Sequence, residues 1–260
     1  MSSSLTMSEQ INLSGYYIEA AAWNTRLCKE LEDEGINSYR WYEIPESLHN
    51  KHEYTAISSF FASVQFLEAE FNKVLEDGLD LLTNNLKLDL QTQAAKNVYK
   101  LLVSEARKTL EKGSQPHEKF HKYLKTGDFP LWDTNKPPYA DVDLLVNLRN
   151  AYTHYKPKWN ITLQNDLTKL EVDDKKLEKL RNRKDLAPNP LVTNPLLTGI
   201  NTKFFPRKVA CYTYAKWAVE SSLALVEEFY KIIGFPFRYA GGGFDLSTTP
   251  KQNWKKLSES

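Results

Sequence analysis

A long apolar stripe at helical spacing, behind Asn50, constrains the fold more than any other feature of the sequence. It consists of Ile57, Phe60, Phe61, Val64, Leu67, Phe71, Val74 and Leu75, and continues as far as Gly78. Residues three or four apart share one face of an α-helix, so the pattern predicts a helix over about residues 51–77. Asn50 followed by Glu53 matches a capping box and sets the predicted start. A helix with so long an apolar face must pack against other elements.

The other periodic segments also predict helices. Each carries apolar residues at intervals of three or four and has glycine, proline or a capping residue near an end. The expected helices cover about residues 14–35, 91–112, 116–125, 141–155, 173–183 and 206–234. Gly35 and Gly234 are the expected C-caps, Asp141 is an expected N-cap, and residues 173–183 are polar enough to predict a solvated helix. The pattern predicts an all-α helical bundle of about five to seven helices in a single domain.

The segments outside this pattern define the expected domain organisation. Residues 1–13 are Ser-rich and predict a disordered leader, and residues 14–236 make up the bundle. Within the bundle, residues 156–205 form an insertion with a short polar helix and a Pro-rich connection. Residues 237–260 contain three consecutive glycines and predict a flexible C-terminal tail.

The near-equal numbers of basic and acidic residues exclude a strong electrostatic field around the whole protein. The 260-residue chain has 34 basic and 33 acidic residues, a formal net charge of +1. Such a chain has no overall attraction to nucleic acid or to a membrane surface, so any polyanion site must be local. The N-terminus lacks the features of a signal peptide, and no segment approaches about 18 consecutive apolar residues, so we expect a cytoplasmic protein without a membrane partner.

The two cysteines predict no metal or disulfide framework. Cys28 and Cys211 each lie in an apolar helical context. We expect both to be reduced, buried, small hydrophobic side chains.

His117-Glu118-Lys119-Phe120-His121 matches the H-E-x-x-H pattern. On a helix, the two histidines would lie one turn apart and could bind zinc, with Glu118 as the general base of a hydrolase. However, Lys119 places a cation inside the motif, and no glutamate follows at a suitable distance to act as third ligand. The alternative, which the sequence favours, is a peripheral, solvent-facing helix with two incidental histidines.

The helix expected over residues 141–155 has an unusual polar side. Its apolar stripe consists of Leu144, Leu148, Ala151, Tyr152 and Tyr155, and its polar stripe of Asp143, Asn147, Asn150 and His154. Asn150 and His154 are one turn apart, so the amide can orient the imidazole or its ligand. Arg149 is offset from His154 by about 140° around the helix axis. The two side chains therefore meet over one substrate only if the arginine curls around or a second copy of the helix supplies the other half.

This combination suits phosphodiester chemistry without a metal or cofactor. A histidine moves protons near neutral pH, and a guanidinium holds two phosphate oxygens. On RNA the 2′-hydroxyl is an internal nucleophile. The structural alternative is that Arg149 forms a surface ion pair and His154 caps the helix end. Glu68 lies at the edge of the long stripe, where a partly desolvated carboxylate needs a partner. It is a supporting site residue together with Asn147, Tyr155 and Lys156 of the helix segment.

The segment from Leu148 to His154 resembles the R-x4-6-H signature of HEPN domains, in the form with a polar residue directly after the arginine. Residues 58–72 and 215–222 fit the same resemblance. It implies a HEPN-like bundle that dimerises along the helix of residues 141–155, with Arg149 and His154 as catalytic residues and Asn150 as their polar assistant.

The resemblance also implies a function. Many HEPN proteins are metal-independent endoribonucleases of toxin–antitoxin, phage-defence or RNA-processing systems, which implies an RNA substrate and allows an antitoxin or other regulatory partner. Other members are non-catalytic modules that bind RNA or a protein, and this is the main alternative. The zinc hydrolase based on His117 and His121 is the second alternative.

Overall fold

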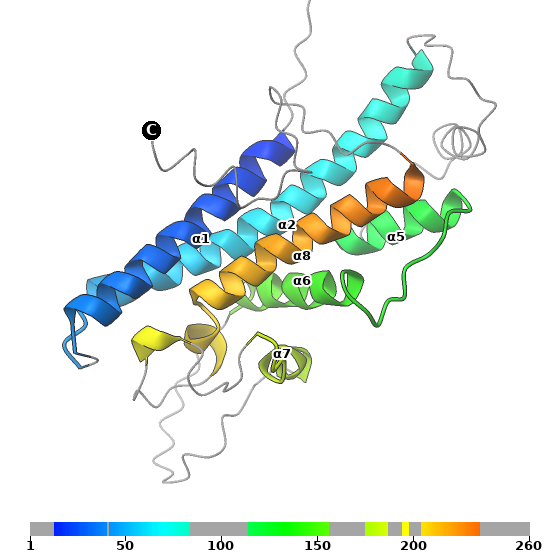
Figure 1. The fold of residues 1–260 in the computed structure, drawn as a ribbon. Coiled ribbons are helices and arrows are strands. Elements are labelled where there is room, and N and C mark those ends of the chain that lie inside the picture. The colour runs from blue at the N-terminus through cyan, green and yellow to red at the C-terminus, as the bar shows by residue number, and fades with distance from the viewer. Residues whose placement is uncertain are drawn as a thin grey trace, which may run out of the picture.

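Helix α2 (Glu46–Thr83) is the central element of the protein in the computed structural model. It packs against α1 (Leu13–Ser38), α5 (Pro116–Thr126), α6 (Tyr139–Thr153) and α8 (Tyr212–Ile233). Figure 1 shows α1, α2 and α8 as long rods that run side by side, with the shorter α5 and α6 in green along them. The fold class predicted from the sequence, an all-α helical bundle in one domain, is confirmed.

The structure describes residues 13–40, 42–83, 114–155, 175–186, 194–197 and 204–234, with the backbone alone at 76–83, 175 and 176. The helix predicted over residues 91–112 lies outside the described residues. So do residues 1–12 of the expected leader, the whole expected tail and most of the segment 156–205. Within the described part, no helix is long and apolar enough to cross a bilayer.

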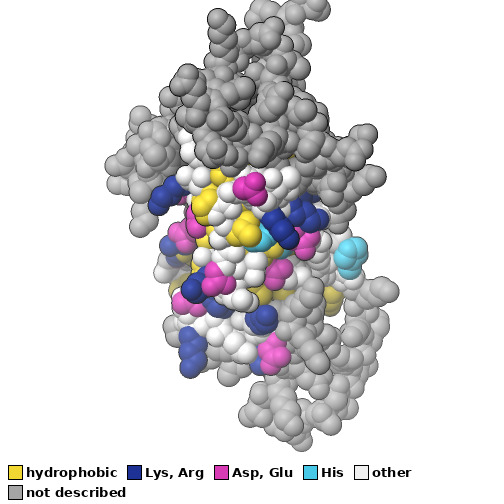
Figure 2. Space-filling view, turned by 90° about the vertical axis from the view of Figure 1, so that its right-hand side faces the viewer, with side chains coloured by type: hydrophobic (Ala, Val, Ile, Leu, Met, Phe, Trp, Pro, Cys, Tyr) yellow, Lys and Arg dark blue, Asp and Glu magenta, His cyan; other side chains and the backbone are white. Residues whose placement is uncertain are grey.

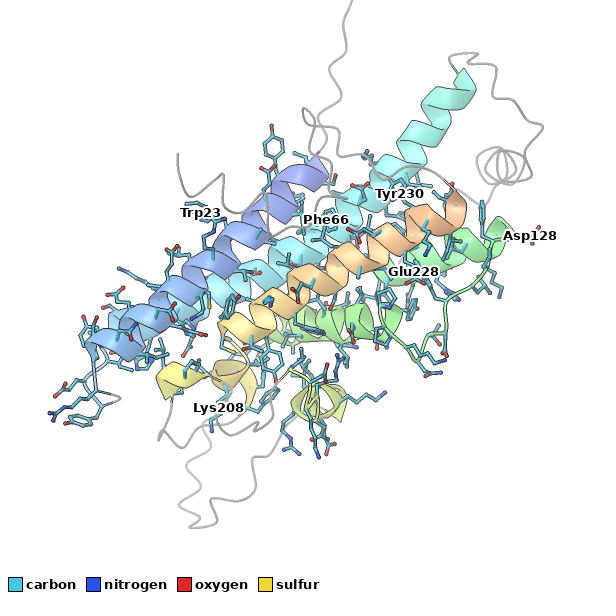
Figure 3. The ribbon with its side chains drawn as sticks, in the orientation of Figure 1. Trp23, Phe66, Asp128, Lys208, Glu228 and Tyr230 are labelled. Carbon is cyan, nitrogen blue, oxygen red and sulfur yellow. The ribbon has the colours of Figure 1, made fainter. Side chains whose placement is uncertain are left out.

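The core of the bundle is formed by the apolar faces of α1, α2, α5, α6 and α8. Its largest fully buried side chains are aromatic and include Phe60, Phe66, Phe71, Phe120 and Phe229. Phe71 and Phe229 each pack edge-on against Phe120, an arrangement that the quadrupoles of the rings favour. Figure 3 labels Phe66 on α2 and Tyr230 on the neighbouring α8, whose hydroxyl donates to the buried Glu70 at 2.8 Å. The long stripe in the sequence therefore forms a helix that packs against several others, as predicted, and it lies at the centre of the fold.

The predicted boundaries of α1 and α2 were wrong. Gly35 does not end α1 but lies inside it, buried, and a β-carbon there would come within 2.4 Å of Leu196 Cδ2. Leu196 belongs to the short 3-10 helix η2 (Pro195–Leu197), so the glycine serves close packing. Helix α2 begins at Glu46 instead of residue 51, and the Glu53 carboxylate accepts from Arg207 Nε at 2.7 Å instead of completing a cap.

The predicted start of the last helix was also wrong, whereas its end is confirmed. Pro206 lies in the irregular turn η3 (Phe204–Lys208), where Phe205 is extended with φ −104° and ψ 139°. An extended residue before a proline is compatible with a helix start, as at Gln115 and Pro116 of α5, but here the turn does not continue and α8 begins only at Tyr212. Cys211 is the N-cap of α8, and Gly234 ends it in the left-handed region with φ 76°.

Helix α7 (Lys175–Arg181) packs against α6. The prediction of a short helix is confirmed. The prediction that this helix is solvated was wrong, because Leu177 and Leu180 are buried in the core. Asp141 does not cap α6, for which Pro138 is the N-cap, and its carboxylate pairs instead with Arg183 just after α7. This ion pair and the two leucines hold α7 beside the first turn of α6.

Candidate functional site

The candidate site is carried by the last two turns of α6. The inner side of the helix is fixed by Leu144, Leu145 and Leu148, which are all buried. The polar stripe faces outward as predicted: Asp143 and His154 are exposed, and Asn147 and Asn150 are half-buried. The buried side is wider than predicted, because Val142 and Val146 are buried as well. Asn147, Asn150 and His154 therefore lie on a narrow polar strip between buried flanks, and Arg149 lies outside it.

His154 is the C-cap residue of α6 and is exposed to solvent. Its backbone N–H donates to the carbonyl oxygen of Asn150 at 3.0 Å, which closes the last turn of the helix. The imidazole has no hydrogen-bond partner among the described residues, so it is free to meet a ligand. This position at the helix end also agrees with the alternative that His154 only caps the helix.

Arg149 is half-buried on a different side of the helix. Burial lowers the pKa of its guanidinium, and the negative charge of Glu68 on α2 raises it. Its Nε is buried without a hydrogen-bond partner in the described part of the chain. The buried Nε is not open to a substrate, so a phosphate oxygen would have to meet the part of this half-buried side chain that reaches solvent.

Glu68 has the partner that its position in the stripe predicted. Its carboxylate accepts from Lys119 Nζ on α5 at 2.5 Å, and the two side chains are 29% and 13% exposed. Glu68 thus lies between two cations, Arg149 and Lys119, which leaves one positive charge in excess. Lys119 belongs to the H-E-x-x-H segment, and sequence reasoning did not connect it with Glu68 because the two are far apart in the chain.

The other supporting residues have structural contacts. Asn147 Nδ2 donates to the carbonyl oxygen of Asp143 at 2.8 Å, within the helix. Tyr155 is 47% exposed and packs edge-on against Phe205 with ring centroids 5.6 Å apart. Tyr152 anchors the end of α6, because its hydroxyl donates to the carbonyl oxygen of Pro206 at 2.5 Å. Lys156 lies outside the described residues.

The H-E-x-x-H segment is not the solvent-facing helix that was predicted. His117 is buried, its Nε2 lies 3.4 Å from Asp143 Oδ1, and its ring packs edge-on against Tyr139. His121 is half-buried between Tyr139 and Trp132. Desolvation lowers the pKa of both histidines, which favours their neutral form.

Glu118 of the same motif has a structural role. Its carboxylate accepts from the backbone N–H of Gln115 at 3.1 Å and completes a capping box at the start of α5. In the described part of the chain, the two histidines do not join a third side chain in a compact group of metal ligands. The geometry therefore gives the zinc hydrolase no support.

Basic and acidic side chains are interspersed on the face of the molecule in Figure 2. This agrees with the near-zero net charge. Long-range attraction of RNA is therefore weak on this face, and binding must come from short-range contacts.

Comparison with known proteins gives no relatives. No family model matches the chain, and neither a curated protein nor a solved structure shows significant similarity to it. A functional proposal must therefore be argued from the geometry of α6 and its neighbours.

Proposed function

We propose that the protein is a HEPN-type, metal-independent endoribonuclease that works as a homodimer through α6. The observation that carries the proposal is the end of α6, where a half-buried arginine with an unused donor and an exposed histidine share one helix. The half-buried Asn150 lies one turn before His154. These are the groups that transphosphorylation of RNA requires from a protein.

The reaction uses the substrate's own nucleophile. The ribose 2′-oxygen loses its proton and attacks the phosphorus, the bond to the 5′-oxygen breaks, and the 5′-oxygen takes up a proton. The products are a 2′,3′-cyclic phosphate and a 5′-hydroxyl. His154 transfers the proton near neutral pH, and Arg149 stabilises the negative charge on the phosphoryl oxygens.

Arg149 and His154 point to different sides of α6, so we propose a dimer in which each chain supplies one of the two side chains to a shared site. Arg149 lies towards Glu68 on α2, whereas His154 is exposed at the helix end. A two-fold axis beside α6 brings the His154 of one copy towards the Arg149 of the other, because an isologous interface pairs each residue with residues near its own symmetry mate. A role as a toxin or phage-defence effector, with an antitoxin as partner, is consistent with such an enzyme.

Cleavage of single-stranded RNA tests the proposal. We expect the wild type to cleave RNA in the presence of EDTA, and Arg149→Ala and His154→Ala each to lower the rate by at least about 100-fold. The matched control is Arg40→Ala, which removes an exposed arginine just after the end of α1. This variant should keep full activity.

Two outcomes contradict the enzyme proposal. Varied RNAs that stay intact with micromolar wild-type protein exclude cleavage as the function. RNA that is bound but not cleaved identifies the non-catalytic module instead.

A further inference from the structure

Three potential metal ligands lie together in the core where α1 and α2 meet the start of α8. Cys28 and Glu32 are one turn apart on α1, and His52 faces them from α2. All three are buried, and one ligand atom of each lies within 4.8 Å of the others. A thiol, a carboxylate and an imidazole are ligands that zinc accepts together.

Some nitrogen and sulfur atoms of this group lack a strong hydrogen-bond partner among the described residues. His52 Nε2 lies 2.9 Å from Glu32 Oε1, which also accepts from the backbone N–H of Tyr212 at 2.7 Å. His52 is fully buried, yet its Nδ1 has no hydrogen-bond partner among the described residues. Cys28 Sγ makes a long contact of 3.8 Å with the carbonyl oxygen of His52 and also interacts with the Thr55 side chain. A buried, unpaired imidazole nitrogen is costly unless it binds something.

We propose that Cys28, Glu32 and His52 bind one zinc ion that joins α1 to α2. Ligand atoms around tetrahedral zinc are roughly 3.3–3.8 Å apart, given bonds of about 2.0–2.3 Å. The group therefore closes around the ion with movements of about 1 Å. The 2+ charge compensates the buried Glu32 carboxylate and stabilises the Cys28 thiolate.

Cys211 lies near the group, close enough for an electrostatic interaction with Cys28, but outside the set of three ligand atoms that lie within 4.8 Å of one another. It is the N-cap of α8 and directly precedes Tyr212, whose N–H contacts Glu32. It is buried. Three protein ligands leave the fourth position of a tetrahedral zinc ion open, and a shift of Cys211 towards the ion would fill it and tie α8 to α1 and α2.

Metal analysis of the full-length protein tests this inference. After purification in a phosphine reductant without chelator, we expect a stoichiometric amount of zinc. Removal of the zinc should lower the midpoint of thermal unfolding by at least about 5 °C, and added Zn²⁺ should restore it. Co²⁺ in place of zinc should show the sulfur-to-metal charge-transfer absorption of a tetrahedral thiolate site.

Variants identify the ligands. Cys28→Ser and His52→Gln should lose zinc, and Glu32→Gln and Cys211→Ser should lower the affinity by at least about 10-fold. The double variant His117→Gln/His121→Gln is the matched control and should keep stoichiometric zinc. The chelation experiment on the wild type needs no variant, so it decides even if a substitution prevents folding.

Three results would overturn the proposal. They are wild-type protein that takes up no Zn²⁺ and gains no thermal stability from it, zinc retained by both Cys28→Ser and His52→Gln, and zinc lost only from the His117/His121 variant. Circular dichroism must accompany the ribonuclease assay in EDTA. A loss of activity with a loss of helix reports on the zinc site, and a loss of activity in a folded, chelated protein reports on the proposed function.

Discussion

Glu68 is the residue that links the candidate site to the rest of the bundle. It connects α2 with Lys119 of α5 and lies close enough to Arg149 of α6 to raise the pKa of the guanidinium. A carboxylate in this position orients the arginine and offsets the cost of its partial burial. We therefore assign Glu68 a positioning role for Arg149.

Replacement of Glu68 by Gln tests this role. The variant keeps the shape of the side chain but removes the charge, so we expect kcat for RNA cleavage to fall about 10-fold with a small change in KM. Glu220→Gln, which removes an exposed carboxylate from α8, should leave both constants unchanged. If Glu68→Gln lowers only the thermal stability and leaves kcat intact, its role is structural.

His117 gives a prediction for stability against pH. Burial lowers its pKa below the ordinary value of 6.5, an effect that Asp143 and Glu118 oppose and His121 adds to. The unfolded chain therefore binds more protons than the folded one between the folded pKa and about 6.5. Stability is present in full above pH 6.5 and is lost as the pH falls through that window, by at most about 1.4 kcal/mol per pH unit for this group.

Urea unfolding of wild type and His117→Gln at several pH values measures this contribution. We expect the free energy of unfolding of the wild type to fall more steeply than that of the variant between about pH 6.5 and pH 5.5. Groups that do not interact with His117, including the proposed zinc ligands, act on both proteins and cancel in the difference, whereas Asp143, Glu118 and His121 contribute together with His117. Parallel curves would show that His117 does not titrate differently in the folded and unfolded states.

At the residue scale, the sequence predicted environments better than partners. The position of Glu68 in the stripe predicted partial burial and the need for a partner. Its actual partner is 51 residues away, and only tertiary structure brings them together. The burial of His52 was missed, although it lies four residues before Ala56 and eight before Phe60, on the same buried face. This helical spacing was the available signal.

At the scale of elements, Gly35 of α1 shows that a glycine can either end a helix or allow close packing inside one. In sequence, Gly35 predicts a helix end, whereas in the structure it admits Leu196 against the helix backbone. The burial of α7 could not be predicted from its sequence either. Its segment is polar apart from two leucines, and only the packing against α6 buries them. Helix existence follows from local spacing, but helix boundaries and docking depend on partners that are distant in the chain.

Gly35→Ala should destabilise the protein by up to about 2 kcal/mol. Alanine favours a helix over glycine by about 1 kcal/mol, but the new methyl group would lie 2.4 Å from the buried Leu196 Cδ2, and such overpacking costs about 1–3 kcal/mol. Urea unfolding of both single variants and the double variant with Leu196→Ala separates the two effects. In the Leu196→Ala background, Gly35→Ala should be neutral or stabilising. An equal loss in both backgrounds would rule out the contact as the cause.

The whole molecule determines whether the site is complete in one chain. Helix α5 contacts the start of the polar strip of α6 through His117 and Asp143, whereas Asn150 is half-buried and His154 is exposed at its end. The near-zero net charge does not oppose association of two copies. A dimer along this strip would place two histidines and two arginines around one substrate groove.

Mixing two inactive variants tests this composite site. Arg149→Ala and His154→Ala homodimers each lack one catalytic group in both sites, whereas a heterodimer has one site with an intact Arg149 from one chain and an intact His154 from the other. Random exchange puts half of the chains into heterodimers with one intact site of two, so we expect the mixture to recover roughly one quarter of the wild-type rate. Exchange is verified with differently labelled subunits, and Arg149→Ala mixed with itself is the control. Verified exchange without recovery would mean that Arg149 and His154 must act from the same chain, since only then does every heterodimer site lack one of them.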